Sequence, residues 1–173
     1  SNMITIVIVS MLLTPLAIRH GPRLVDTAFL RISRKALEKA EEQTLVLDRE
    51  HKNHILILGF GRVGQTIARF LRPLNIDYIA LETDDVRIRE ASAAAEPIFY
   101  GDSSRLDILK AAGAADASIV VISFANADLT EKILHHVREI NPTVPVLVRT
   151  RDDSNLDRLI NAGASEVVPE THE

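Results

Sequence analysis

The chain has 173 residues, a net charge of −4 at pH 7 and an apolar fraction of 46%, which suits one packed domain with an appendage and argues against disorder. It has no cysteine, so a disulfide framework, a thiolate metal site and a cysteine nucleophile are excluded. The charges are of mixed sign without a basic block, so the composition gives no reason to expect nucleic acid as a partner.

The first 18 residues combine a short polar start with an uncharged apolar run. Ser1 and Asn2 have the character of an expression-tag remnant, and residues 3–18 (MITIVIVSMLLTPLAI) carry no charge. A membrane span needs about 20 apolar residues, so we expect residues 1–18 to hold the tag remnant and the truncated end of a transmembrane helix. A core helix or an edge strand is the alternative. Arg19, His20 and Arg23 follow directly, which is typical of the cytoplasmic side of a membrane.

Residues 19–53 form a charged segment. Gly21 and Pro22 break the preceding pattern, and ISRKALEKAEEQTLVLDREHK (residues 32–52) places glutamates and lysines on neighbouring turns of a predicted helix. We expect a charged helical linker that joins two domains. An ordinary solvated helix is the alternative.

From residue 54 to residue 173 apolar runs alternate with amphipathic helical patterns. Near-continuous apolar strands separated by helices are typical of a parallel sheet that is covered on both faces. The sequence therefore predicts an α/β fold, a Rossmann-type doubly wound parallel six-stranded sheet preceded by a helical linker. The predicted strands are HILILG, DYIALE, PIFYG, SIVVISF, VPVLVRT and EVVPE.

The turn after the first predicted strand carries a GxGxxG pattern, in ILILGFGRVGQTIARFLRPL (residues 55–74). Gly59 permits a tight turn, Gly61 lets a ligand approach the backbone, and Gly64 lets helix and strand pack closely. The helix start presents unpaired N–H groups and the positive end of its dipole, so a phosphate is the expected ligand. Helical spacing predicts one apolar face that contains Ile67, Phe70, Leu71 and Leu74.

The second predicted strand ends in YIALETD, with Glu82 where a ribose-binding acid belongs. Its carboxylate can accept hydrogen bonds from the 2′- and 3′-hydroxyls, and its charge makes NADP the least favoured nicotinamide form. An exposed strand-end carboxylate without a ligand is the alternative.

The third predicted strand ends in YGDSSRLDIL, at the same edge of the sheet. We expect Ser103 or Ser104 to cap the next helix, with Asp107 completing a capping box. An adenine base that reaches over the sheet edge from Glu82 would also meet Asp102 and Ser103.

Three arginines are candidates for binding anions. Arg62 lies inside the glycine motif, where a cation opposes the helix dipole, and this cost indicates an anionic partner. Arg149 and Arg151 end the fifth predicted strand in LVRTRDD. They either meet a second anion or pair with Asp152 and Asp153.

The sequence contains no recognisable catalytic apparatus. It has no YxxxK pattern, no metal-ligand spacing and no nucleophile–base constellation. We therefore expect a binding site without catalytic residues or a metal ion. A free-standing NAD-dependent oxidoreductase domain is the alternative.

Taken together, GFGRVGQ, ALETD, YGDSSRLDILKAAGA and VRTRDD resemble the RCK regulatory domain, also called the KTN or TrkA N-terminal domain, over residues 52–173. The arginine and glutamine around the third glycine, with YGD, are similar to Kef-type potassium/proton antiporters, the glutathione-regulated potassium-efflux family. By this resemblance the nucleotide-binding domain spans residues 54–173. The candidate cofactor-binding residues are Gly59, Phe60, Gly61, Arg62, Val63, Gly64, Glu82, Thr83, Asp102 and Ser103.

The resemblance also implies partners. It predicts a homodimeric domain on the cytoplasmic face of the inner membrane that binds AMP or NAD(H) and gates the K⁺ flux of its own transmembrane antiporter domain. Glutathione is a further expected partner, because Arg62 and Arg151 match arginines of a glutathione site, and Arg149 lies two residues before Arg151.

Overall fold

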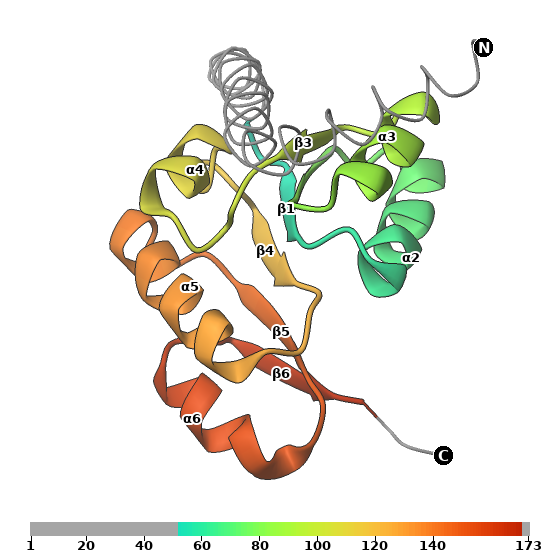
Figure 1. Cartoon of the computed structure of the whole chain (residues 1–173). Coiled ribbons are helices and arrows are strands. Elements are labelled where there is room, and N and C mark those ends of the chain that lie inside the picture. Colours follow the sequence, from blue (N-terminus) through green and yellow to red (C-terminus); the bar gives the residue numbers. More distant parts are fainter. Residues whose placement is uncertain (1–51, 171–173) are drawn as a thin grey trace, which may run out of the picture. The chain divides into compact units, whose positions relative to one another are not determined.

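The computed structural model describes residues 52–170, so the predicted membrane segment and all but the last two residues of the predicted linker lie outside the described residues. Within this range the strands form one parallel sheet of six in the order β3-β2-β1-β4-β5-β6 (Figure 1). The predicted six-stranded doubly wound fold is therefore confirmed. The strands are β1 (Ile55–Leu58), β2 (Tyr78–Glu82), β3 (Ile98–Tyr100), β4 (Ile119–Ile122), β5 (Val146–Thr150) and β6 (Glu166–Pro169).

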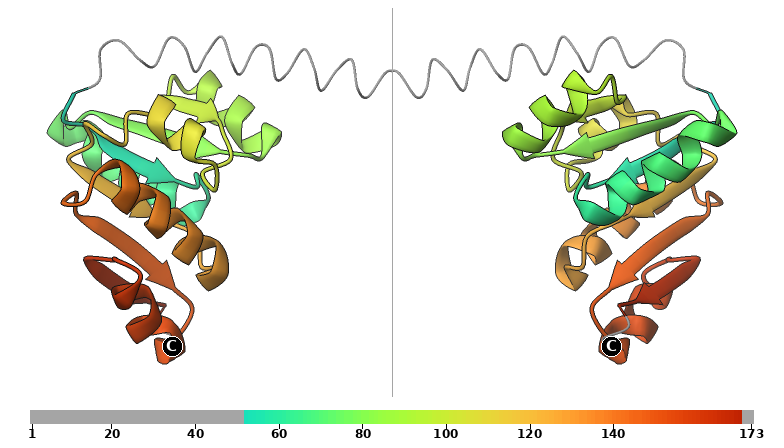
Figure 2. Two further views of the ribbon diagram at one scale, coloured as in Figure 1. Left: turned by 90° about the vertical axis from the view of Figure 1, so that its left-hand side faces the viewer. Right: turned by 90° about the vertical axis from the view of Figure 1, so that its right-hand side faces the viewer.

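Helices cover both faces of this sheet (Figures 1 and 2). One face carries α2 (Arg62–Leu71), the short helix η1 (Arg72–Leu74) and α3 (Asp85–Ala93). The other face carries α4 (Leu106–Ala111), α5 (Ala127–Ile140), η2 (Asp153–Asn155) and α6 (Leu156–Asn161). Because side chains alternate along a strand, β1 supplies Ile57 to the core under α2 and Leu56 and Leu58 to the core under α5.

The order of the strands creates a switch point beside β1. The chain runs from β1 to β2 and β3 on one side, and then crosses to place β4 on the other side of β1. The connections that leave β1 and β4 therefore turn to opposite faces of the sheet, and such a point opens a crevice at the carboxyl ends of the strands. The sequence motifs singled out above come from these strand ends.

Helix α2 buries a narrower stripe than predicted. Gly64 and Ala68 are buried and Ile67 and Leu71 pack against the same core, so the buried positions follow the i, i+3, i+4, i+7 spacing of one helix face. Phe70, by contrast, is 70% exposed because it lies off this stripe. The prediction of a single apolar face is therefore wrong for Phe70.

The prediction is also wrong for Leu74, which is 66% exposed. Leu74 belongs to the 3₁₀ turn η1, whose tighter winding breaks the α-helical phase before the left-handed residue Asn75 (φ 53°).

Between residues 52 and 170 no helix is both long enough and apolar enough to cross a membrane.

Candidate functional site

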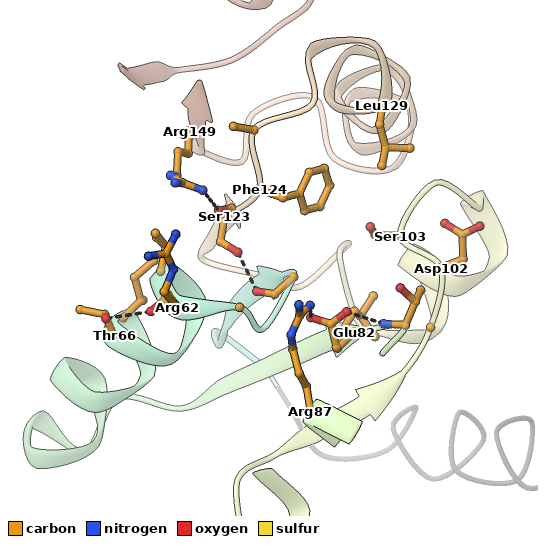
Figure 3. Close-up of a pocket in the computed structure, with 18 of the residues that line it drawn as sticks. Arg62, Thr66, Glu82, Arg87, Asp102, Ser103, Ser123, Phe124, Leu129 and Arg149 are labelled. Carbon is orange, nitrogen blue, oxygen red and sulfur yellow. Dashed lines mark hydrogen bonds and ion pairs between the residues drawn. The ribbon is translucent and has the colours of Figure 1, made fainter. Parts of the chain in front are cut away.

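A cleft of about 1010 Å³ lies at the carboxyl ends of β1, β2, β4 and β5 (Figure 3). Its walls combine the glycine turn, the ends of β2 and β3, and the segment after β4. Most of the residues predicted from the sequence line it. These are Gly59, Gly61, Arg62, Val63, Glu82, Thr83, Asp102, Ser103, Arg149 and Arg151.

The glycine turn needs its first and third glycines for backbone reasons. Gly59 has φ 90°, a left-handed conformation that favours glycine, and its N–H donates to the carbonyl of Leu81 over 2.8 Å. A side chain at Gly64 would overlap the carbonyl oxygen of Gly59. The chain can therefore turn sharply from β1 and start α2 directly against the strand end.

The second glycine faces open space. A Cβ atom at Gly61 would meet no heavy atom within 4 Å, so the protein itself does not require a glycine here. Gly61 is also the N-cap of α2, it provides no side-chain cap, and the first turn contains no acidic residue. The N–H groups of the first turn are thus open to an anion in the cleft.

Arg62 stands beside this helix start. Its side chain is exposed, and within residues 52–170 the guanidinium has no hydrogen-bond or ion-pair partner. Figure 3 shows Arg62 and Arg149 on one side of the cleft and Asp102 and Ser103 on the other. A guanidinium next to an uncapped helix N-terminus makes this side of the cleft suited to an anion.

Two predicted site residues do not line the cleft. Phe60 is only 2% exposed and packs its ring in the core under α2. Gly64 is buried where α2 meets the glycine turn. Both residues support the glycine turn from its buried side.

Glu82 is held by backbone groups on three sides. Its Oε2 accepts from the N–H of Phe60 over 2.8 Å, and its Oε1 accepts from the N–H groups of Thr83 and Asp84 over 2.8 and 3.1 Å. Burial by itself raises the pKa of this carboxyl, but the three backbone donors and Arg87 outweigh burial and hold the pKa below its ordinary value. Glu82 is therefore a charged carboxylate that is built into the turn.

Arg87 is a cleft residue that the sequence did not single out. It lies on α3, with Nη1 at 3.4 Å from Oε2 of Glu82 and Nε at 3.7 Å from Oδ2 of Asp84. Both distances are long, and the side chain is 46% exposed, so this ion pair is weak. Nothing in the sequence linked Arg87 to Glu82, five residues before it, because their contact depends on the direction in which α3 leaves the end of β2.

The β3 end differs from the prediction. Neither Ser103 nor Ser104 caps the next helix, because α4 starts at Leu106 with Arg105 at the N-cap and no side-chain cap bond. Instead, Oδ1 of Asp102 accepts from the N–H of Ser104 over 2.9 Å, and Asp107 pairs with Arg105. The expected capping box is therefore wrong, since a short turn is inserted before the helix.

The end of β4 joins the glycine turn to β5. Ser123 donates from Oγ to the carbonyl of Gly59 over 2.7 Å and accepts at its own carbonyl from Nη1 of Arg149 over 3.2 Å. Arg149 also forms an ion pair with Glu170. Ser123 was missed although it lies in the predicted strand SIVVISF, because its contact with the glycine turn cannot be read from its own segment. Arg151 is exposed and lines the cleft.

The cleft offers no metal site. Within residues 52–170 no cluster of histidine, aspartate and glutamate could hold a metal ion. The wall instead mixes arginines and carboxylates with a short apolar stretch at Phe124 and Leu129. This mixture suits a ligand that has both an anionic group and an apolar or aromatic part.

Comparison with known proteins agrees with this architecture. The TrkA-N domain family matches residues 55–170. Over 170 residues the chain is 38% identical to a protein from Alkalimonas amylolytica assigned as the K(+) efflux antiporter KefB, covering 98% of this chain but only 26% of that protein. The chain thus spans about a quarter of the length of this relative.

Two solved structures show the same fold. The TrkA-N domain of the inner membrane protein YbaL from Escherichia coli superposes with a TM-score of 0.66 at 24% identity, covering 69% of this chain and 89% of that one. The C-terminal domain of Kef from Shewanella denitrificans, in an AMP-bound form, superposes with a TM-score of 0.56 at 27% identity, covering 68% and 71%. With two thirds of its length matched by the family, the chain belongs to the TrkA-N domain family.

Proposed function

We propose that residues 54–173 are the regulatory domain of a K⁺/proton antiporter and that the cleft binds AMP or the AMP half of NAD(H). One observation carries the proposal: the unpartnered Arg62 stands beside the uncapped start of α2, and the charged Glu82 lies across the glycine turn. The KefB relative supports the antiporter, and the AMP-bound Kef domain supports the ligand.

Each part of the nucleotide has a proposed partner. The first N–H groups of α2 and Arg62 bind the phosphate. The ribose hydroxyls donate to Oε2 of Glu82 and replace the long contact with Arg87 at 3.4 Å. Asp102 and Ser103, at the end of β3, face the adenine base. The negative charge of Glu82 disfavours a 2′-phosphate, so NADP is not an expected ligand.

The setting of the domain is a further part of the proposal, which the KefB relative supports. We propose that it lies on the cytoplasmic face of the inner membrane, as a homodimer joined to its own transmembrane antiporter domain, and that nucleotide binding changes ion transport. Light scattering of the purified chain is expected to show a dimer.

The domain is expected to bind NADH without oxidising it, and steady NADH oxidation with a simple carbonyl compound would favour an oxidoreductase instead.

The experiment that tests the ligand is a titration of AMP and NADH into the wild type and into Gly61→Val. Because space is open at Gly61, valine leaves the fold intact and fills the path of the phosphate. A ligand at about 100-fold excess over Kd stabilises the fold by about 2.7 kcal/mol, so the wild-type melting temperature should rise. Gly61→Val should show no such rise while its melting temperature without ligand stays close to that of the wild type.

Arginine variants distinguish a specific phosphate site from a general effect of positive charge on AMP binding. Arg62→Ala removes a charged hydrogen-bond donor and should weaken AMP binding roughly tenfold to a hundredfold. Arg89→Ala is the matched control, because Arg89 is also exposed but points to the backbone carbonyl of Asp85, outside the cleft. An unmoved wild-type melting temperature, or equal losses in the two arginine variants, would contradict the assignment of the cleft.

A further inference from the structure

Arg62 and Arg149, on one side of the cleft, differ in whether they are free. The guanidinium of Arg62 has no partner within residues 52–170. Arg149, by contrast, donates from Nη1 to the carbonyl of Ser123 over 3.2 Å and forms an ion pair through Nη2 with Glu170. The side chains of this ion pair are only 26% and 31% exposed, and both residues line the cleft. A carboxylate of the protein itself therefore occupies a guanidinium in the wall of the cleft.

The backbone of the sheet holds this ion pair in place. In the parallel register of β5 and β6, Arg149 lies opposite Val168. Glu170 follows Val168 by two residues, and side chains two residues apart along an extended chain point to the same face of the sheet. The N–H of Glu170 also donates to the carbonyl of Thr150 over 2.8 Å, which continues the pairing with β5 beyond the end of β6. The sheet therefore directs the carboxylate of Glu170 at Arg149.

The ion pair lies on the path that an extended ligand would take across the cleft. The strands follow in the order β2, β1, β4, β5, with Glu82 at the end of β2, the glycine turn after β1 and Arg149 near the end of β5. Ser123 connects the turn to β5, because its Oγ donates to the carbonyl of Gly59 over 2.7 Å while its own carbonyl accepts from Arg149. In Figure 3 Arg149 lies beside Ser123, across the cleft from Asp102. A nucleotide with its ribose at Glu82 and its first phosphate at the glycine turn would therefore bring a second phosphate towards Arg149.

We propose that Glu170 is a specificity-determining residue, which makes the cleft prefer a nucleotide with one phosphate, such as AMP, over one with a second phosphate, such as ADP or a dinucleotide. This inference rests on the proposed function, because it requires the first phosphate to bind at the start of α2. AMP can bind to the helix start and to Arg62 without disturbing the ion pair. A second phosphate has to displace Glu170 from Arg149 or lie beside its carboxylate.

Both arrangements lower the affinity for a second phosphate. An arginine binds a phosphate best through two parallel N–H donors, but the contacts with Ser123 and Glu170 engage both Nη groups of Arg149. When a ligand requires the open form of the pair, its apparent affinity falls by the fraction of molecules that are open. A pair near the strong end of the range for surface ion pairs is open in about one molecule in five, which lowers the affinity about fivefold. If the pair stays closed, the carboxylate repels the second phosphate, and such a repulsive contact also gives selectivity.

Calorimetric titrations of AMP and ADP into the full chain, in magnesium-free buffer, test the proposal, since these two ligands differ by one phosphate. The quantity compared is the Kd for AMP divided by the Kd for ADP. Glu170→Ala should raise this ratio about fivefold over the wild type, and Glu170→Gln, which keeps the size of the side chain, should change it in the same direction. The matched control is Glu166→Ala, because Glu166 is an exposed glutamate at the start of β6, outside the cleft. Glu166→Ala should keep the wild-type ratio.

A second set of variants tests whether the change in the ratio depends on Arg149. Arg149→Met removes the guanidinium and keeps an unbranched side chain, so adding Glu170→Ala to Arg149→Met should leave the ratio unchanged. An equal rise with and without Arg149 would mean that Glu170 acts only through the net charge of the cleft, and this result overturns the proposal. AMP binding to the wild type with an unchanged ratio in Glu170→Ala also overturns it, and the proposed function then stands. If neither nucleotide binds to the wild type or to Glu170→Ala, the proposed function fails and this inference fails with it.

Discussion

The Oε2 atom of Glu82 accepts a hydrogen bond from the backbone N–H of Phe60 over 2.8 Å. This bond ties the end of β2 to the middle of the glycine turn after β1. The carboxylate proposed to bind ribose therefore also holds the turn proposed to bind phosphate. A change at Glu82 should affect both the stability of the fold and the affinity of the cleft.

Glu82→Gln should lower stability at neutral pH by about 1–3 kcal/mol, because an amide NH₂ cannot accept from the buried backbone donors. The pKa of Glu82 is lowered in the fold, so its stabilising contribution is present above the unfolded-state pKa, near 4.5, and is lost as the pH falls through the lower folded-state pKa. The variant should therefore lose less stability on acidification than the wild type does.

Urea unfolding at neutral and acidic pH measures this difference. Glu90→Gln on α3 is the control, because Glu90 is an exposed glutamate outside the cleft. If Glu82→Gln and Glu90→Gln have the same pH dependence, the Glu82 carboxylate does not carry the predicted contribution.

Gly64→Ala should destabilise the protein by about 1–3 kcal/mol, since its Cβ would collide with the Gly59 carbonyl and force α2 away from the turn. Gly61→Ala meets open space and should change stability by less than about 1 kcal/mol. Comparison of the two unfolding free energies in urea checks the prediction, and equal values would mean that α2 can shift freely.

Tyr78→Phe should change the alkaline stability. Burial, followed by the hydrogen bond to Glu96, raises the pKa of Tyr78 to about 12 from 10.0. A raised pKa contributes stability that is complete below pH 10 and is lost as the pH rises toward about 12. The wild type should therefore lose stability across this window, and Tyr78→Phe should lose less.

Tyr100→Phe serves as the control, because Tyr100 is 39% exposed and the chain has only two tyrosines. Phenolate absorbance during a pH titration of each single-tyrosine variant reports the folded-state pKa directly. Titration of Tyr78 near pH 10 would contradict the prediction.

The glutathione site expected from the sequence at Arg62, Arg149 and Arg151 predicts a difference between two ligands. Arg151 is exposed, and an exposed ion pair contributes about 0.2–1 kcal/mol. Arg151→Ala should therefore weaken the binding of reduced glutathione about twofold to fivefold at low salt. Arg151→Ala should leave AMP binding unchanged, whereas Arg62→Ala should weaken the binding of both ligands. Calorimetric titration of each variant measures the effect, and glutathione binding that ignores Arg151→Ala would remove this residue from the site.

Much of the site could be predicted because strand ends in a parallel sheet meet at one edge. Gly59, Glu82 and Asp102 each lie at or just after the end of a strand that is recognisable by its apolar run, so their meeting in one cleft followed from the fold class. Ser123 and Arg87 were missed, since nothing in their own segments distinguishes them. Each is defined by a contact with another segment, Ser123 with the Gly59 carbonyl and Arg87 with Glu82.

The sequence alone determined the order of strands and helices, the parallel sheet and the glycine turn, because these follow from local patterns: apolar runs, helical periodicity and residues that permit a positive φ. Only the tertiary structure decided which side chains are free. Arg149 is paired with Glu170 while the guanidinium of Arg62 has no partner within residues 52–170, and Phe70 faces solvent while Ile67 packs inward. Pairing and burial depend on residues far away in the chain, and their positions are fixed only when the sheet and its helices have assembled.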